Sequence, residues 1–189
     1  MQGVRGEHKQ PGEFRTSQNW IGASLKHATY VPPHHDYIHE LMGDLESFIH
    51  NEEIHVPHLI KAGILHYQFE TIHPFLDGNG RLGRLSIALY LENHHLLIKP
   101  ALYLSDFFER NKGDYYNHLT GVRKNNNMSM WLRFFLLGVQ ETAQRSVGVF
   151  KAILALKESI EREIMPQFHT RRQQNALTLM QTLYQHPVV

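Results

Sequence analysis

The sequence predicts an all-α domain, a bundle of helices that carries one β-hairpin near its beginning. Apolar residues recur at intervals of three and four from Asp36 onward, which is the spacing of amphipathic helices. Two short β-prone stretches, residues 14–21 and 28–31, flank a small loop, and the second ends at a pair of prolines, which is typical of a hairpin. No further strands alternate with the helices, so a parallel sheet is not expected.

The helices are expected to follow one another along the rest of the chain. Residues 36–51 have one apolar face, whereas residues 56–72 are apolar nearly all round, so the second helix is expected to be buried on several sides. The other expected helices are residues 81–98, two shorter helices within 102–125, residues 129–165 with soft interruptions at Gly138 and Gly148, and a last segment from residue 171.

Composition excludes several kinds of site. The 189 residues suit one domain, or one domain with part of a second. The chain has no cysteine, so disulfides and thiolate metal sites are excluded, and a cytoplasmic location is expected. A net charge of +1 does not indicate nucleic-acid binding. The sequence contains no apolar run of about 18 residues, so no membrane span is predicted. The 15 histidines allow metal binding, but we interpret them as scattered surface residues, because spacing alone does not show converging ligands.

The stretch ETIHPFLDGNGRLGRL, which follows the second expected helix, overlaps three known loop motifs. Gly78, Gly80 and Gly83 match the spacing of a dinucleotide-binding fingerprint, but that fingerprint needs a strand before it. A P-loop would require lysine where Arg84 stands. A calcium loop would require glycine where Leu82 stands. All three motifs are therefore excluded.

The residues of this loop instead suit the phosphates of a nucleotide. Gly78, Asn79 and Gly80 can adopt backbone angles closed to most residues and bring N–H groups close to a ligand. We expect a helix to begin at about Arg81, and the N-terminus of a helix attracts anions. Arg81 and Arg84 lie three residues apart on one helix face, so their guanidinium groups suit a di- or triphosphate.

Two other side chains of the loop suit catalysis. Asp77 would repel phosphate unless a cation lay between them, and Mg²⁺ is usually held by one carboxylate together with phosphate oxygens. His73 has a usual pKa near neutrality, which makes it the natural general base. An alternative stays open on these residues alone: a glycine loop that merely joins two helices, with Arg81 solvated or paired with Asp77. Phe75 and Leu76 are expected to anchor the loop to the core.

The residues from His73 to Arg84, HPFLDGNGRLGR, resemble the signature of the Fic family, H-x-F-x-[D/E]-G-N-G-R-x-x-R, at every specified position. The resemblance extends over roughly residues 3–145, because PGEFRTSQNWIG and YVPP resemble the flap hairpin of the family and YLSDFFERNKGDYY resembles a flanking helix. It implies a Fic catalytic domain at residues 1–165 with the flap at 14–33. Residues 166–189 would be a linker and the start of an incomplete, winged-helix-like module.

The resemblance also implies an activity, the transfer of AMP from ATP to a Ser, Thr or Tyr hydroxyl of a target protein. ATP would be the substrate and Mg²⁺ the cofactor, with His73 as the general base and Asp77 as the metal ligand. The residues implied in phosphate binding are Gly78, Asn79, Gly80, Arg81, Gly83 and Arg84. Tyr115 and Tyr116 resemble a tyrosine pair near the nucleotide of relatives, although neighbours on a helix are not expected to face one pocket together.

The flap is expected to dock the target segment by adding a strand at an exposed edge, and a plain lid is the alternative. The residues expected to dock the target are Gln18, Asn19, Trp20, Ile21 and Gly22. A homodimer stays open, and contact with DNA is expected only through the incomplete C-terminal module. Two other functions stay open: removal of AMP or transfer of another phosphate-linked group in the same pocket, and a non-catalytic, nucleotide-sensing regulatory module.

Many members of the family carry an inhibitory helix, [S/T]-x-x-x-E-[G/N], whose glutamate pairs with the arginine that matches Arg84. Ser159 and Glu163 have the S-x-x-x-E spacing, but Ile164 follows them, and such a match is common on a charged helix. We therefore expect the inhibitory helix to lie before the first residue of this chain or in another chain. The chain by itself is then expected to be deregulated.

Overall fold

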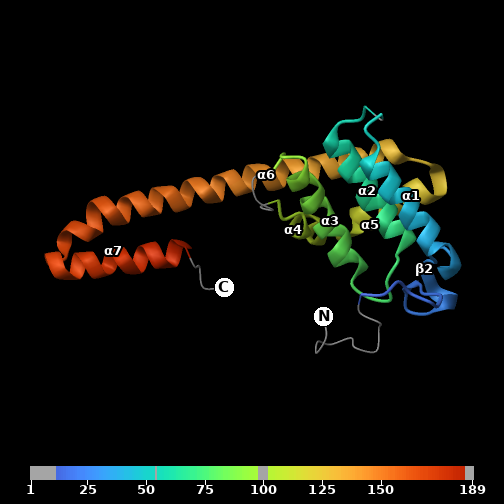
Figure 1. Ribbon diagram of the computed structural model, residues 1–189, viewed down its shortest axis with the longest axis horizontal. Coiled ribbons are helices and arrows are strands. Elements are labelled where there is room, and N and C mark those ends of the chain that lie inside the picture. The colour runs from blue at the N-terminus through green and yellow to red at the C-terminus, as the bar shows by residue number, and fades with distance from the viewer. Residues whose placement is uncertain (1–11, 54, 98–101, 186–189) are drawn as a thin grey trace. The chain divides into compact units, whose positions relative to one another are not determined.

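The computed structural model describes residues 12–53, 55–97 and 102–185, and these are mainly helical with one short antiparallel sheet (Figure 1). They belong to two units, Met1–Thr142 and Ala143–Val189. The all-α fold with one β-hairpin is therefore confirmed. The first residues of the expected Fic domain, 1–11, and the last of the expected winged-helix-like module, 186–189, lie outside the described residues.

The helices of the first unit correspond to those that the sequence predicts. Within its described residues they are α1 (Ile38–His50), α2 (His58–Ile72), α3 (Asn79–Asn93), α4 (Ser105–Arg110), α5 (Lys112–Asn125) and the first half of α6 (Met128–Ser159). Helix α3 begins at Asn79, slightly earlier than expected, because Gly78 adopts a φ of 85° and serves as its N-cap. The signature loop thus lies between the two central helices α2 and α3.

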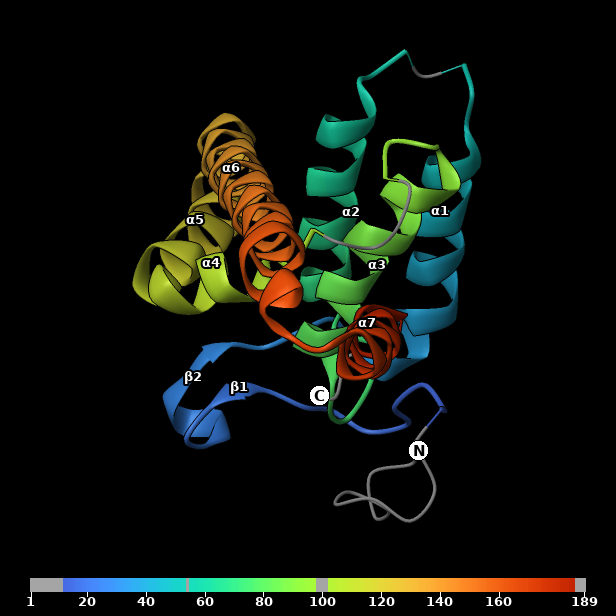
Figure 2. The ribbon, with the colours of Figure 1, turned by 90° about the vertical axis from the view of Figure 1, so that its left-hand side faces the viewer.

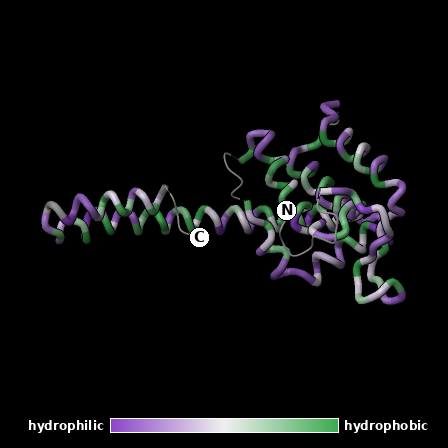
Figure 3. The backbone as a smooth tube through the Cα atoms, turned by 60° about the horizontal axis from the view of Figure 1, so that its bottom comes forward, coloured by the Kyte–Doolittle hydropathy of each residue, from purple (hydrophilic) through white to green (hydrophobic). Residues whose placement is uncertain are grey.

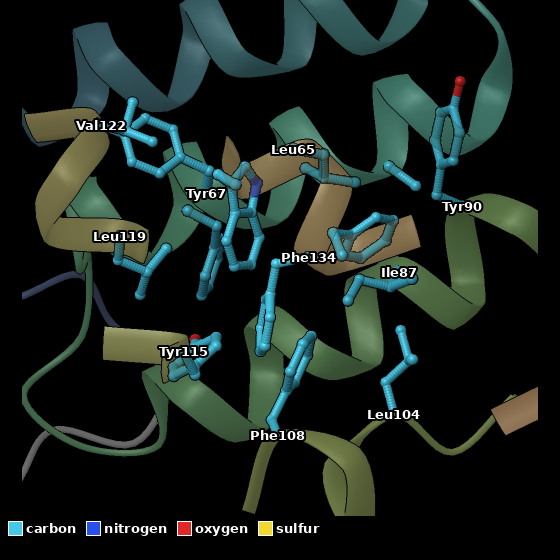
Figure 4. Packing of buried hydrophobic residues seen from close by; sticks show 14 of the residues in the cluster. Leu65, Tyr67, Ile87, Tyr90, Leu104, Phe108, Tyr115, Leu119, Val122 and Phe134 are labelled. Carbon is cyan, nitrogen blue, oxygen red and sulfur yellow. The ribbon is translucent and has the colours of Figure 1, made fainter. Parts of the chain in front are cut away.

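The core of the first unit forms around α2, because this helix is apolar on nearly every side. Trp131 of α6 is fully buried, and its Nε1 donates to the carbonyl of Gly63 in α2 at 2.9 Å. The rings of Phe108, Tyr115 and Phe134 pack around this tryptophan, with centroids 5.9 to 6.4 Å from its own. Figure 4 shows these three rings among the buried residues of the core. These contacts fix α4, α5 and α6 relative to α2 and so to the loop that follows it.

The hairpin is shorter than the sequence predicts and lies at the end of the first unit where α2 gives way to α3 (Figure 2). Strand β1 is Ile21–Gly22 and strand β2 is Ala28–Tyr30, joined through a 3-10 turn at Leu25–His27. Ile21 pairs with Tyr30, and a bulge follows between Ile21 and Gly22. The expected strand at residues 14–21 is therefore wrong for all but its last residue. Gln18 and Asn19 bond through their side chains, to the carbonyls of Pro32 and Phe75, instead of through a backbone ladder.

Helix α6 continues into the second unit without a break. Gly138 and Gly148 lie inside it, so the soft interruptions expected there are wrong. A π-helical turn (Ile160–Ile164) and a 3-10 turn (Met165–Gln167) follow, and then α7 (Thr170–Gln185). Apolar residues recur along both helices of this unit (Figure 3). The predicted domain boundary at residue 165 and the winged-helix-like module stay predictions. Nowhere in the described ranges does a helix have both the length and the apolar character that crossing a membrane requires.

Candidate active site

The candidate active site begins where α2 ends in an uncommon backbone conformation. His73 follows the helix with φ 51° and ψ 58°, a left-handed region that residues other than glycine rarely adopt. Its N–H still donates to the carbonyl of Phe69 at 2.9 Å, so this turn closes the helix. Pro74, which is fully buried, carries the chain into the signature loop. A strained residue at this position persists only because its surroundings hold it there.

The imidazole of His73 is half-buried and neutral. Burial lowers the pKa of His73 to about 4, and the positive charges of Arg15 and Arg123 act in the same direction. The nearby backbone of Glu70 opposes them without completing a hydrogen bond, and the buried Nδ1 of His73 has no partner among the described residues. A neutral imidazole can accept a proton, and the negative charge of a bound phosphate would raise its pKa toward neutrality.

Asn79 closes the loop between the two central helices. Its Oδ1 accepts from the N–H of Phe75 at 2.9 Å, and its Nδ2 donates to the carbonyl of Phe75 at 2.7 Å. Only the backbone of Asn79 is therefore left to meet a ligand. Because α3 begins here, the N–H groups of Asn79, Gly80 and Arg81 have no acceptor within the helix. They form an anion-attracting helix N-terminus of the kind that the sequence predicts.

Asp77 and Arg81 lie on the exposed side of this helix start. Their side chains are 55% and 67% exposed, and Nη2 of Arg81 lies 3.9 Å from Oδ2 of Asp77. An exposed pair at this distance contributes little to stability, so neither side chain is committed to the other. Oδ1 of Asp77 accepts from the N–H of Gly78 at 2.8 Å. One exposed carboxylate beside a helix N-terminus fits Mg²⁺, which completes its coordination with phosphate oxygens and water.

A second group of possible metal ligands lies at the start of α1. The ligand atoms of His34, His35 and Asp36 lie within 4.8 Å of one another. Nδ1 of each histidine lies 3.1 Å from one oxygen of Asp36, and all three side chains border solvent. Pairing between the histidines and the carboxylate explains this group without an ion.

A cavity of about 350 Å³ lies beside the signature loop. Its lining residues are Arg84, Tyr103, Ser105, Asp106, Phe108, Glu109, Lys112, Tyr115 and Tyr116. Arg84 joins the loop to this cavity, because its Nη1 lies 3.2 Å from a Cβ placed on Gly80 and its Nε donates to Oγ of Ser105 at 2.9 Å. The volume is that of a small-molecule site, and aromatic rings next to charged groups suit the base and the phosphates of a nucleotide.

Tyr115 and Tyr116 both line the cavity, contrary to our expectation that neighbours on a helix would not share it. Tyr115 is buried and closes the inner wall, whereas Tyr116 is exposed. The hydroxyl of Tyr115 lies 3.0 Å from Nε2 of His66, and Nδ1 of His66 lies 2.8 Å from the carbonyl of Gly83. A carbonyl only accepts, so Nδ1 carries the hydrogen and Tyr115 donates to Nε2. Burial lowers the pKa of His66 to about 4, which keeps this linking ring neutral.

Glu70 brings a buried carboxyl group to the back of the site. Glu70 is 6% exposed, and its Oε1 has no hydrogen-bond partner among the described residues. Burial raises the pKa of Glu70 to about 7, although Arg84 and Arg123 act to lower it. A Cβ placed on Gly83 would lie 2.8 Å from this oxygen, so Gly83 permits the close approach of α2 and α3. Phosphate binding by Gly83 stays a prediction.

Side chains of the flap bind the loop and the second half of the hairpin. Nε2 of Gln18 donates to the carbonyl of Pro32 at 2.9 Å, and Nδ2 of Asn19 donates to the carbonyl of Phe75 at 3.1 Å. Trp20 is 43% exposed and is the large apolar surface among the predicted docking residues. Gln18 and Asn19 therefore shape the flap, while Trp20 is available to a partner.

Sequence reasoning missed four residues that the structure places at or behind the site. His66 and Glu70 precede His73 on α2 by seven and three residues, so helical spacing could have placed them on the same face. Arg15 and Arg123 are distant in sequence, and the tertiary structure alone brings them to the turn. Nη2 of Arg123 donates to the carbonyl of Glu70 at 3.2 Å, and Nε of Arg15 donates to that of His73 at 3.0 Å.

The sequence model of the Fic/DOC family matches residues 1–91, which include the flap and the signature loop. The chain carries a Fic/DOC family domain. Over 75 residues the chain is 40% identical to protein adenylyltransferase Fic of Aedes aegypti. Over 145 residues it is 25% identical to protein adenylyltransferase fic-1 of Caenorhabditis elegans. These alignments cover 39% and 75% of this chain but only 14% and 26% of the relatives, so the chain spans about a quarter of their length or less.

Solved structures agree with this assignment. A Fic family protein from Desulfovibrio desulfuricans G20 superposes with a TM-score of 0.66 at 29% identity, over 77% of this chain and 43% of that one. A fragment of Fic-1 from C. elegans superposes with a TM-score of 0.54 at 23% identity, over 75% of this chain and 38% of that one, which shows the fold alone. The Fic resemblance that the signature predicts is confirmed.

Proposed function

We propose that this chain transfers AMP from ATP to a Ser, Thr or Tyr hydroxyl of a target protein. The observation that carries the proposal is the placement of His73. Its neutral imidazole stands at the end of α2 and leads into a loop that closes on the open N-terminus of α3. The names of the curated relatives, protein adenylyltransferases, support the same activity.

In the proposed reaction, His73 accepts the proton of the target hydroxyl while the hydroxyl oxygen attacks the α-phosphorus of ATP. The bond from this phosphorus to the oxygen that bridges to the β-phosphate breaks, and pyrophosphate leaves with the electron pair. The N–H groups at the start of α3 and the guanidinium of Arg84 hold the phosphates. Such transfer depends mainly on positioning and on neutralisation of charge, which these groups supply. Mg²⁺ held by Asp77 would add further neutralisation of the phosphate charge.

The two sides of the site would receive the two substrates. The cavity bordered by Tyr115 and Tyr116 is the proposed place of the adenine base, because it connects to the phosphate loop through Arg84. The flap is the proposed dock for the target, by strand addition next to the exposed Trp20. The proposed compartment is the cytoplasm, which supplies ATP and Mg²⁺. A homodimer and a DNA contact stay predictions.

The match of Ser159 and Glu163 to the inhibitory motif is the alternative that the sequence did not favour. Within the second unit, Oε2 of Glu163 accepts from Oγ of Ser159 at 3.1 Å. This contact joins the last residue of α6 to the π-helical turn that follows it.

Labelled ATP tests the proposed function. The chain is incubated with Mg²⁺, a total protein extract and ATP labelled at either the α- or the γ-phosphate. AMP transfer labels protein from the α-position and leaves the γ-label in pyrophosphate. We expect His73→Ala to lower the labelling by about 10²- to 10⁴-fold, because the general base is lost, while calorimetry shows an unchanged affinity for ATP.

His95→Ala is the matched control. His95 is also a left-handed residue, with a φ of 56°, but it is exposed and follows the end of α3. Its replacement should leave labelling unchanged. Labelling from the γ-phosphate that requires this chain, release of AMP from a labelled protein instead of its addition, or undiminished labelling by His73→Ala would each contradict the proposal. ATP binding without any labelling would favour a nucleotide-sensing module.

A further inference from the structure

Arg15 is a buried arginine that the proposed mechanism does not use. It is 2% exposed, and among the described residues no carboxylate forms an ion pair with it. Its guanidinium donates to three backbone carbonyls instead: Nε to His73 at 3.0 Å, Nη1 to Ser17 at 3.1 Å and Nη2 to Pro33 at 2.5 Å. A buried cation without such partners is strongly destabilising, so these bonds determine where the side chain lies.

One side of Arg15 holds the turn that carries His73. The backbone N–H of Arg15 donates to the carbonyl of Pro74 at 2.9 Å, while Nε binds the preceding carbonyl of His73. Two successive carbonyls of the turn are therefore bound by one residue. A left-handed residue other than glycine costs on the order of 1–3 kcal/mol and persists only where its surroundings impose it. Arg15 is part of those surroundings, and it sets the direction in which the imidazole leaves the backbone.

The other side of Arg15 holds the base of the flap. Ser17 precedes strand β1 and Pro33 follows strand β2, so the guanidinium bridges the two ends of the hairpin. We propose that Arg15 is a positioning residue that couples the flap to His73, so that the imidazole faces the hydroxyl of a target docked on the flap. This inference rests on the proposed transfer of AMP.

The charge of Arg15 acts on the same imidazole. The charged groups that face His73 are Arg15 from the start of the flap and Arg123 from α5, and both lower its pKa, while the backbone of Glu70 in α2 opposes them. Removal of Arg15 takes away one positive charge and loosens the turn that buries the ring. Both changes raise the pKa of His73. This pKa therefore reports on the contact between Arg15 and the turn at His73 even when no reaction takes place.

The experiment compares Arg15→Met and Arg15→Lys with the wild-type chain. The pKa of His73 is measured by NMR on the imidazole signal that disappears in His73→Gln. Calorimetry gives the Kd for ATP, and AMP transfer gives kcat and KM. We expect Arg15→Met to raise the pKa of His73 by about one unit, to lower kcat about 10²-fold and to leave the Kd for ATP unchanged. Arg15→Lys keeps the charge but cannot reach three carbonyls, so the pKa of His73 should rise less than in Arg15→Met while kcat still falls.

Lys61→Met is the matched control, because Lys61 is also a buried cation that binds a backbone carbonyl. It is 6% exposed, and its Nζ donates to the carbonyl of Asn51 at 2.6 Å. The proposal is overturned by an unchanged pKa of His73 in Arg15→Met, by an equal shift in Lys61→Met, or by a loss of ATP binding in step with kcat. A wild-type chain that transfers no AMP would refute the proposed function, whereas the NMR titration would still decide whether Arg15 sets the state of His73.

Discussion

Replacement of Gly83 by alanine tests how closely the two central helices must approach to build the site. Alanine in a helix is usually more stable than glycine by about 1 kcal/mol. At Gly83, however, the new Cβ would lie 2.8 Å from Oε1 of Glu70, 3.1 Å from Cδ1 of Phe69 and 3.3 Å from Nδ1 of His66. All three side chains are buried, so they cannot move aside without displacing their neighbours.

Overpacking of this kind costs about 1–3 kcal/mol, which outweighs the gain in helix propensity. After the gain of about 1 kcal/mol in helix propensity is subtracted, we expect Gly83→Ala to lower the free energy of unfolding by up to about 2 kcal/mol. The displaced His66 would also lengthen its bond to the carbonyl of Gly83 and loosen its hold on Tyr115, so the affinity for ATP should fall as well.

Urea unfolding measures this difference through fluorescence, because Trp131 lies in the core of the first unit. Gly43→Ala is the matched control: Gly43 lies inside α1, and a Cβ placed on it meets no atom within 4 Å. The free energy of unfolding of Gly43→Ala should rise by about 0.5–1 kcal/mol. If Gly83→Ala gained stability as the control does, the close approach of α2 and α3 would not have the role that we assign to it.

Two further predictions concern Glu70 and Trp20. Because burial raises the pKa of Glu70 from 4.5 to about 7, the unfolded chain ionises first and stability falls as the pH rises from 4.5 to 7. The free energy of unfolding of Glu70→Gln, relative to that of the wild type, should therefore rise by about 2 kcal/mol from pH 5 to pH 8 in urea unfolding. A difference that stays constant across this range would contradict the prediction. Trp20→Ala should raise KM for a protein target about tenfold without changing the Kd for ATP, because an exposed aromatic residue is a frequent anchor for a partner. An equal loss of affinity for ATP would instead indicate that the flap is a lid over the nucleotide.

Local patterns in the sequence were sufficient to predict the helices and the loop. The three-four spacing of apolar residues places α1 to α5, and the all-round apolar character of residues 56–72 identifies α2 as the central helix. The predicted strand at residues 14–21 failed for a long-range reason. Gln18 bonds across the hairpin to Pro32, and Asn19 bonds to Phe75 in the loop, so this stretch follows contacts that no local pattern contains.

The sequence by itself determined the candidate chemistry, because His73, Asp77 and the glycines that follow them are neighbours in the chain and any fold keeps them together. The tertiary structure decided the state of these groups. Whether His73 is neutral depends on its burial and on Arg15 and Arg123, and whether Glu70 is ionised depends on the approach of α2 to α3. Burial and long-range charge are properties of packing, so they appear only when distant segments meet.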